Sequence, residues 1–489
     1  MNMLYGFIKQ LNRSFYHLLL IWGLLTPASA SQTTRLPDLG SSDLIAYDSQ
    51  TEQALGRAFS TALHTQYNLN YDPDVVSYIR KIGHEITSQI GERRSFKFYV
   101  IDDLSINAFA GPNGIIGIHT GLILAAKNED ELAAVIAHEI AHVTQNHLSR
   151  GYETNSKQSN LTTIATLLAA ALIGMYDSSA VYPTLMAGLS LNIEKQLKNS
   201  RLHESEADHI GIQFLSKAGY DPHSMGDFFA RLAKESQNSA RQIPEILRSH
   251  PVTERRIVES ENRAQMLSVQ TPKPHNNELT LIQLKLRSHA KISNTPLSSF
   301  QKPADDIICY QQNLQTLTKQ SKQASANIDC LQTLVQHNPN HLLYTTLLLQ
   351  TFIKHHVSDS KKINMALHQA TYLLDIYPNN TALLLSYSDL LLYLNQPSKA
   401  ITLLNTHTEH LRYTYQAYKK LSEIYAQQQQ TAEAHFFLAL AQFDIGNLKR
   451  TQYLLKQAKI TADHSLKQRI SLFEHRNSNL LKHKEIRKH

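Results

Sequence analysis

Residues 128–143 constrain the fold most strongly, because they combine clear helix signals with ionisable side chains. The segment reads Asn-Glu-Asp-Glu-Leu-Ala-Ala-Val-Ile-Ala-His-Glu-Ile-Ala-His-Val. Asn128 is a suitable N-cap, and Glu131 three residues later completes a pattern like a capping box. Apolar residues then recur at helical spacing, at Leu132, Val135, Ile136, Ile140 and Val143. We therefore expect a core helix, in which the two histidines and the glutamate need compensation when they are buried.

The ionisable residues of this helix form the pattern HExxH. His138 and His142 are four positions apart, so both imidazoles leave one face and can bind one zinc ion. Glu139 lies beside them, where its carboxylate can take a proton from the attacking water. The alternative is the charged face of an ordinary helix. The pattern predicts a hydrolytic zinc site, as in a peptidase.

A catalytic zinc needs a third protein ligand, and the sequence offers a candidate in residues 201–211. Glu204 and Asp208 are four apart and share one helical face. Glu204 is the predicted ligand, and Asp208 is predicted to hydrogen-bond a ligand histidine and fix its tautomer. Three rival ligands lie on other faces of the same segment: His203, Glu206 and His209.

The order of these motifs resembles the gluzincin peptidases related to the CAAX prenyl protease and the HtpX heat-shock protease. The resemblance covers about residues 45–260 and includes Asn-Ala-Phe-Ala-Gly-Pro at 107–112, HExxH, ExEAD at 204–208 and His-Pro-Val-Thr-Glu-Arg-Arg at 250–256. It implies an α+β, mainly α domain with a small sheet and one zinc ion per chain. It also implies that one strand aligns substrate backbone beside the site, namely Asn107, Ala108, Phe109 and Ala110. Asn113 departs from the glycine that is common at its position.

Two residues near the end of this region have open interpretations. His250 is a loop histidine, an oxyanion stabiliser, or a group that occupies the open metal position in a latent enzyme. Arg256 either holds this loop through a carboxylate pair or binds substrate. We count His250 with Glu139 and Asp208 among the catalytic candidates, and Arg256 as a loop anchor.

The first thirty residues have the pattern of a secretory signal peptide. Lys9 and Arg13 form a basic start, residues 18–25 form an apolar core, and residues 28–30 read Ala-Ser-Ala. The apolar core is too short to span a bilayer. We expect export to the periplasm of a Gram-negative bacterium.

The remaining length predicts two domains joined by a linker. We expect a zinc metallopeptidase domain at 31–265, a linker with an intermediate helix at 266–305, and a helical repeat domain at 306–489. Ala366, Ala400 and Ala434 are spaced by 34 residues, the tetratricopeptide (TPR) period. The pattern predicts an α-helical TPR solenoid with a concave surface for extended segments or partner proteins.

An exported zinc peptidase followed by such repeats resembles the β-barrel assembly-enhancing proteases. The resemblance implies action on unfolded or stalled outer-membrane proteins, chaperone activity, and contact with the outer-membrane assembly machinery through the repeats. Two alternatives remain. One is a chaperone or scaffold in which the repeats dominate and the peptidase is latent. The other is a binding protein with a closed structural zinc site that includes His250.

Three further features carry weaker signals. The uncharged stretch within residues 161–193 is a helical pair over the core, a lid, or an element that contacts the membrane surface. Cys309 and Cys330 form one disulfide bond or remain two buried thiols. The formal net charge of +7 is spread along the chain, so nothing favours nucleic acid as a partner.

Overall fold

The computed structural model describes residues 49–91, 94–148, 150, 193–238, 243–267, 269, 273, 276–289, 305–318, 327–408, 411 and 413–481. All of these residues belong to one compact unit, Ile45–His489. The expected signal peptide, almost all of the apolar stretch at 161–193 and the basic tail at 482–489 lie outside the described residues. None of the described helices combines the length and the apolar character needed to span a bilayer.

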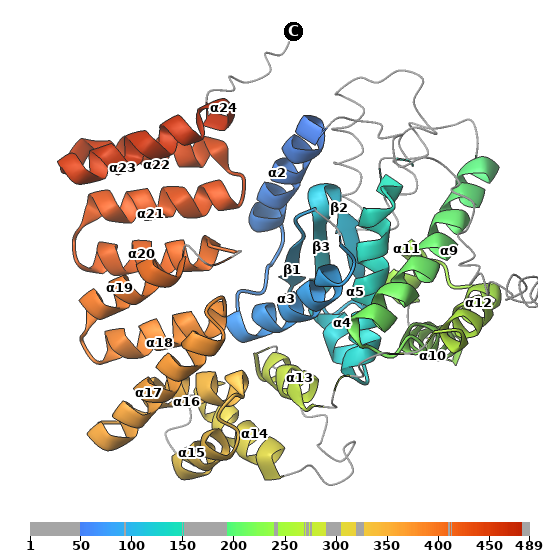
Figure 1. Ribbon diagram of the computed structural model, residues 1–489, viewed down its shortest axis with the longest axis horizontal. Coiled ribbons are helices and arrows are strands. Elements are labelled where there is room, and N and C mark those ends of the chain that lie inside the picture. The colour runs from blue at the N-terminus through green and yellow to red at the C-terminus, as the bar shows by residue number, and fades with distance from the viewer. Residues whose placement is uncertain are drawn as a thin grey trace, which may run out of the picture. The chain divides into compact units, whose positions relative to one another are not determined.

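The first half of the chain combines helices with one small sheet (Figure 1). Its helices, in chain order, are α2 (Ser49–Gln66), α3 (Pro73–Ser88), η1 (Pro112–Gly114), α4 (Thr120–Ala125), α5 (Glu129–Thr144), α9 (Ile193–Ala218), α10 (Ser224–Asn238), α11 (Glu245–Ser249), α12 (Glu254–Gln265) and α13 (Glu278–His289). The strands are β1 (Lys97–Ile101), β2 (Ala108–Gly111) and β3 (Ile115–His119).

The sheet has the order β1-β3-β2, so β3 is central and β2 is an edge strand. β1 runs parallel to β3, with Lys97 opposite Ile115. β2 runs antiparallel to β3, with Ala108 opposite Ile118. The turn between β2 and β3 places Asn113 in the left-handed region, at φ 57°. Asparagine tolerates this conformation better than most residues, so Asn113 can form this turn without glycine.

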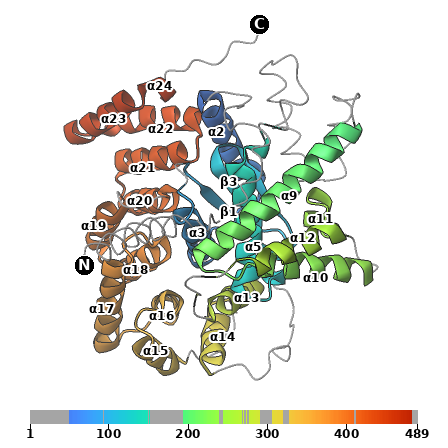
Figure 2. The same cartoon turned by 45° about the vertical axis from the view of Figure 1, so that its right-hand side comes forward.

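The core of the first half is built around α5, as its sequence predicts. Asn128 caps the helix by accepting a hydrogen bond from the backbone N–H of Glu131. The carboxylate of Glu131 accepts from the backbone N–H of Lys127 at 2.8 Å and also pairs with Arg231. α5 packs against β2 on one side and against the long helix α9 on another (Figure 2). The apolar residues of α5 are fully buried among these elements.

The second half is entirely helical in its described part, from α14 to α24 (Figure 1). Its helices are α14 (Asp305–Thr318), α15 (Ile328–His337), α16 (Leu342–Lys354), α17 (Ser360–Ile376), α18 (Thr381–Tyr393), α19 (Pro397–Thr408), α20 (Tyr415–Gln427), α21 (Thr431–Asp444), α22 (Leu448–Thr461), α23 (His464–Arg476) and α24 (Ser478–Leu481). Ala366, Ala400 and Ala434 lie on α17, α19 and α21, and all three are buried. Each therefore occupies a crowded position in successive helical pairs.

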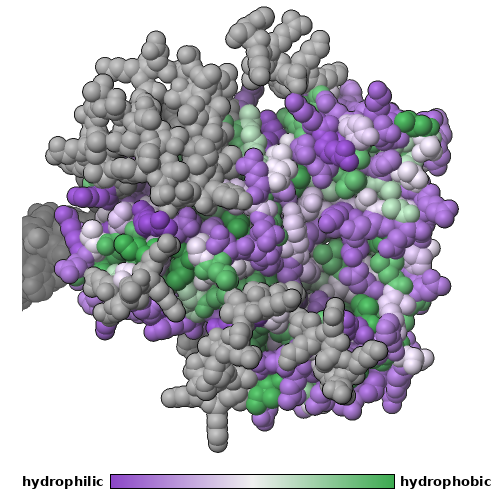
Figure 3. Space-filling model, turned by 180° about the vertical axis from the view of Figure 1, so that it is seen from behind, coloured by the Kyte–Doolittle hydropathy of each residue, from purple (hydrophilic) through white to green (hydrophobic). Residues whose placement is uncertain are grey.

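These observations confirm a mainly α protein with a small sheet and a helical C-terminal region. The domain boundaries at 265 and 306 remain predictions. The helix expected between them is present as α13, and its Lys285 is buried against Asp74 of α3 and lies 3.0 Å from Asp72 Oδ1. Cys309 and Cys330 are joined by a disulfide bond between α14 and α15. Hydrophilic residues cover most of the described surface on the face seen in Figure 3.

Candidate metal centre

The candidate site is assembled by two crossing helices and one loop. α5 carries His138, Glu139 and His142, α9 carries Glu204, and His250 follows the short helix α11. Gly211 allows α9 to approach α5, since a Cβ atom at this position would lie only 3.2 Å from the backbone nitrogen of His138. Close contact between the two helices brings residues 62 positions or more apart in the chain to one point.

Four donor side chains converge there: His138, His142, Glu204 and His250. The Nε2 atoms of His138 and His142 lie 3.0 Å apart. Glu204 Oε2 lies 3.4 Å from His138 Nε2, and Glu204 Oε1 lies 3.5 Å from His142 Nε2. His250 Nδ1 lies 3.3 Å from His138 Nε2 and 3.0 Å from Glu204 Oε2.

These separations fit a metal ion. Two ligand atoms that are each about 2.0 Å from a tetrahedrally bound zinc lie about 3.3 Å from one another. The donor–donor distances of 3.0–3.5 Å match that value. Imidazole nitrogens and a carboxylate are also the donor types that zinc accepts in proteins. The described residues therefore provide a site that fits zinc.

Glu139 points toward this cluster without sharing in it. Its side chain is buried, and its two oxygens accept no hydrogen bond from any described residue. Oε1 lies 3.5 Å from His250 Nε2. A buried carboxylate without a donor is costly, so this arrangement is typical of a group that meets a water molecule or a substrate.

Asp208 and Arg256 support the centre from behind. Asp208 Oδ1 lies 3.0 Å from His138 Nδ1, on the side of the ring away from the cluster. Arg256 donates two hydrogen bonds to Asp208, from Nε at 2.7 Å and from Nη2 at 2.8 Å. Its Nη1 donates to the carbonyl of Pro251 at 2.7 Å. Because Arg256 is buried and ties the His250 loop to α9, this geometry supports its interpretation as a loop anchor.

The electrostatics of the cluster favour a cation. Burial lowers the pKa of His138, but the neighbouring carboxylates of Asp208 and Glu204 raise it to about 10. Burial would raise the pKa of Glu204, yet His250, His138 and His142 hold it well below its usual range. Burial lowers the pKa of His142 and raises that of Glu139. The negative charge of Glu204 and Asp208 therefore stabilises positive charge at this point.

The three rival ligands lie outside the cluster. Glu206 Oε2 lies 3.2 Å from His147 Nε2 and 3.0 Å from Arg150 Nη1. His203 stacks on His147, with ring centroids 4.4 Å apart. His209 contacts Gln213 on the same helix.

His147 is the site residue that sequence reasoning missed. Its Nδ1 lies 2.9 Å from Nδ1 of His142, so it contacts the ring nitrogen that faces away from the cluster. Helical spacing would direct residue 147 elsewhere, but α5 ends at Thr144 and Asn146 adopts φ 54°. The asparagine two residues after the helix was the available signal for this reversal, since such residues often end helices in the left-handed conformation.

A cleft of about 340 Å³ leads to the centre. Glu139, His142 and His250 line one part, and Phe109 and Ala110 of β2 line another. The other two residues of the expected substrate strand do not line it: Asn107 and Ala108 are buried. The backbone carbonyl of Asn107 accepts a hydrogen bond from His119 N–H at 3.1 Å.

Comparisons with known proteins show what the chain is similar to in sequence. Residues 74–264 match the model of peptidase family M48. The chain is 36% identical over 241 residues to the putative beta-barrel assembly-enhancing protease of Vibrio cholerae, covering 49% of each chain. It is 34% identical over 246 residues to the beta-barrel assembly-enhancing protease of Escherichia coli, covering 50% of each. It is also 31% identical over 173 residues to the mitochondrial metalloendopeptidase OMA1 of Arabidopsis thaliana, covering 35% of this chain and 32% of that one.

The chain spans about half the length of the bacterial relatives that it matches. The matched family segment contains HExxH, ExEAD and the His250–Arg256 loop, and it ends within α12. Residues 74–264 are therefore similar to peptidase family M48 over the segment that carries all of these motifs.

Proposed function

We propose that this protein is a zinc-dependent endopeptidase. The observation that carries the proposal is the convergence of His138, His142 and Glu204 beside the buried carboxylate of Glu139, which accepts no hydrogen bond from a described residue. These three side chains would hold one zinc ion per chain. When bound, zinc supplies Lewis-acid chemistry that allows a water molecule to ionise near neutral pH.

Side chains of the protein carry out proton transfer and hold the site in place. Glu139 takes the proton of the attacking water and returns it to the leaving amine nitrogen. Its two oxygens accept no hydrogen bond from any described residue, so they can hold this proton. Asp208 orients His138, and Arg256 holds Asp208 and the loop that carries His250.

The substrate is an extended polypeptide segment. β2 pairs only with β3 among the described strands, so its other edge is available for backbone hydrogen bonds. Phe109 and Ala110 on this strand line the cleft that leads to Glu139. Folded proteins offer few free extended segments, so cleavage selects unfolded or stalled chains.

The names of the relatives and the expected signal peptide support a proposal for the biological setting. Two relatives are named for enhancing β-barrel assembly. We infer that the protein acts in the Gram-negative periplasm on unfolded or stalled outer-membrane proteins, and that it degrades misfolded envelope proteins. The helical repeats α14–α24 would contact the assembly machinery, as a TPR solenoid does. Peripheral membrane contact through the region 161–193 belongs to the same proposal.

The test compares wild type with Glu139→Gln on an unfolded, casein-type substrate. Glu139→Gln should retain zinc and lose at least about a hundredfold in cleavage rate, because only the proton carrier is removed. Cleavage by Glu139→Gln at the wild-type rate would contradict the assignment. The matched control is Glu259→Gln, whose carboxylate pairs with the exposed Arg255 on α12.

A second candidate function is a chaperone with a latent peptidase. The specific observation is His250, which lies within the donor cluster where a closed site would have its fourth ligand. In that case Glu139→Gln would restore outer-membrane protein assembly in a deletion strain as well as wild type does. Failure of Glu139→Gln to restore assembly would favour the peptidase as the working activity.

A further inference from the structure

A groove of about 520 Å³ lies between α3 and the helical second half of the chain, and none of the four donor side chains lines it. One wall is the face of α3 that carries Arg80, Lys81 and His84. The other is formed by the start of α16, by the turn between α17 and α18, and by Tyr413. The volume is in the range of pockets that bind peptides and other ligands of similar size, roughly 300–1,000 Å³.

The acidic residues of this groove already have partners. Glu278 Oε2 accepts a hydrogen bond from Lys81 Nζ at 2.5 Å. Glu85 accepts from the hydroxyl of Tyr220 at 2.6 Å and also pairs with Lys273. Asp74 is paired with the buried Lys285 of α13. No carboxylate lining the groove is left to balance another cation.

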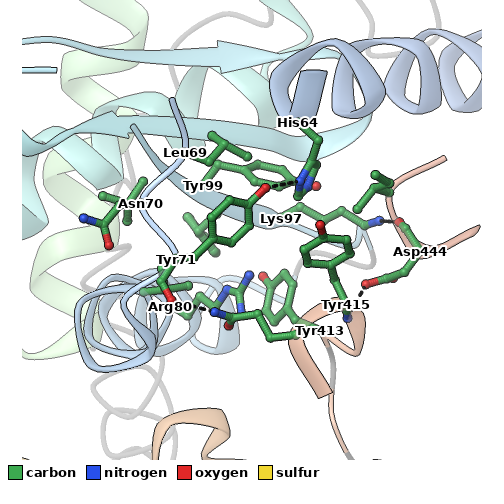
Figure 4. A pocket seen from close by; sticks show the side chains of 15 residues that line it. His64, Leu69, Asn70, Tyr71, Arg80, Lys97, Tyr99, Tyr413, Tyr415 and Asp444 are labelled. Atoms are coloured by element: carbon green, nitrogen blue, oxygen red, sulfur yellow. Dashed lines mark hydrogen bonds between the residues drawn. The ribbon is translucent and has the colours of Figure 1, made fainter. Parts of the chain in front are cut away.

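Arg80 is a cation of this groove that forms no ion pair with the carboxylates lining it. Its guanidinium lies over the ring of Tyr413, 3.7 Å from the centroid, and Figure 4 shows the two side chains side by side. Its Nε is buried without an acceptor, and its guanidinium forms no ion pair within the part of the chain that the structure describes. Burial lowers the pKa of Arg80, and the opposing effects of Tyr413, Tyr99 and Asp444 offset this only in part. An anionic ligand would offset this cost.

Arg80 and Tyr413 separate the groove from a second, smaller cavity. The same two residues, Arg80 and Tyr413, also line a cavity on their other side, which Figure 4 shows between them and the ring of Tyr99. That cavity measures only about 30 Å³, enough for about one or two water molecules but not for a polypeptide. A chain lying in the large groove therefore cannot continue past Arg80 and Tyr413 into this cavity.

We propose that this groove binds the C-terminal end of an extended polypeptide, with its terminal carboxylate paired to Arg80. A guanidinium matches a carboxylate in both charge and planar geometry. The amides of Asn340 and Asn379 line the groove and can bond to peptide groups, while Ile376 and Tyr377 offer apolar surface at 43% and 37% exposure. The inference rests on the proposed function, since it supplies a second contact for the same polypeptide substrates.

The test measures peptide binding by fluorescence anisotropy with the full chain carrying Glu139→Gln, so that the probe is not cleaved. The probe is a short fluorescein-labelled peptide that ends in leucine with a free carboxylate. Two control peptides have an amidated C-terminus, and one of these also contains an internal aspartate. We expect the free-carboxylate peptide to bind at least about tenfold more tightly than both amidated peptides.

Arg80→Gln should remove this tenfold preference, and Arg80→Lys should restore part of it, because lysine keeps the charge and loses the planar fork. Arg255→Gln, on the exposed face of α12, should leave the preference unchanged. Arg80→Lys also serves as the second variant if Arg80→Gln unfolds. Equal binding of free and amidated peptides, or an unchanged preference in Arg80→Gln, would overturn the proposal. Equal binding of the internal-aspartate peptide would overturn the assignment to a chain end.

In this experiment the groove proposal and the peptidase proposal can be contradicted separately. An inactive wild type that still prefers the free carboxylate would contradict the proposed peptidase and leave the groove assignment intact. An active wild type that shows no preference for the free carboxylate would support the proposed peptidase and contradict the groove assignment.

Discussion

The candidate centre depends on a small number of buried charges that compensate one another. Asp208 lies between His138 and Arg256, so one carboxylate orients a predicted ligand and also holds the loop anchor. Glu204 is similarly shared, since it faces the histidines and lies 3.3 Å from Arg256 Nη1. Removing one member leaves the other buried charges with less compensation, which costs more than the loss of a surface ion pair.

Asp208→Asn should therefore lower the free energy of unfolding by about 3 kcal/mol, because the buried Arg256 loses the carboxylate that accepts two of its hydrogen bonds and keeps only Glu204 as a counter-charge. Chemical denaturation in the presence of a chelator measures this effect separately from metal binding. Glu259→Gln breaks the exposed pair with Arg255 and should cost less than about 1 kcal/mol. Equal losses for the two variants would contradict the proposed support of the centre.

His147→Leu should weaken zinc binding by about tenfold to a hundredfold, because the ring nitrogen of His142 loses its orienting partner. Competition with a chromophoric chelator gives the zinc dissociation constant directly, without reference to activity. His209→Gln changes a histidine on α9 that lies outside the cluster and should leave that constant unchanged. An unaltered constant in His147→Leu would rule out this role.

At the scale of single residues, the sequence predicts which side chains share a face of one helix, because this depends on local spacing. Two histidines four apart on a helix with a recognisable cap must share a face, and Glu204 and Asp208 follow the same rule. His147 could not be placed in this way, because its position depends on the backbone reversal at Asn146. The sequence also could not show that Arg80 lacks an ion-pair partner in the groove. This depends on ion pairs that the groove's carboxylates form with lysines, two of them far away in the sequence.

At the scale of elements, the short helix α11 and the loop after it border the candidate metal centre. α11 is anchored by a hydrogen bond from Ile246 N–H to the carbonyl of Ile106, 3.0 Å long. Arg256 holds the other end of the loop through Pro251. His250 is thus held in the donor cluster from both sides. The strand β2 and this loop border the same cleft.

His250→Ala should increase the cleavage of unfolded substrate several-fold, because it opens the position that His250 occupies among the four donors. It should also weaken zinc retention, since one of the four donors is lost. Initial cleavage rates at saturating zinc separate these two effects. A large fall in rate with zinc still bound would instead assign His250 to stabilisation of the oxyanion.

Helical elements were the more predictable ones. The repeat spacing of Ala366, Ala400 and Ala434 identified the buried positions of α17, α19 and α21. The intermediate helix was also expected, but its ion pair with α3 was not, because Lys285 and Asp74 are 211 residues apart. Periodicity reveals which face of a helix is buried and leaves open what covers it.

At the scale of the whole molecule, the peptidase elements and the repeat helices meet through polar contacts. The hydroxyl of Tyr413 donates to the carbonyl of Phe96 at 2.8 Å, and Lys97 Nζ donates to that of Asp444 at 3.2 Å. His64 of α2 lies in the same contact, 2.7 Å from the hydroxyl of Tyr71 and beside the ring of Tyr415 (Figure 4). This contact forms one side of the small cavity next to the groove at Arg80.

The contact should weaken in acid. Burial, together with Lys97 and Arg80, lowers the pKa of His64 to about 4, whereas an unfolded histidine titrates near 6.5. The unfolded chain therefore binds more protons in this window, so the stabilisation is complete above about pH 6.5 and is lost as the pH falls toward 4. His64→Gln should flatten the decline of the melting temperature across this range, and His464→Gln on the exposed start of α23 should not.

The most direct test of the central claim is the zinc content of the purified full chain, measured by inductively coupled plasma mass spectrometry. We predict about one zinc ion per chain in wild type and in Glu139→Gln, and close to none in His138→Ala and Glu204→Ala. Wild type that holds no zinc even after zinc is supplied, or His138→Ala that holds as much as wild type, would contradict the account.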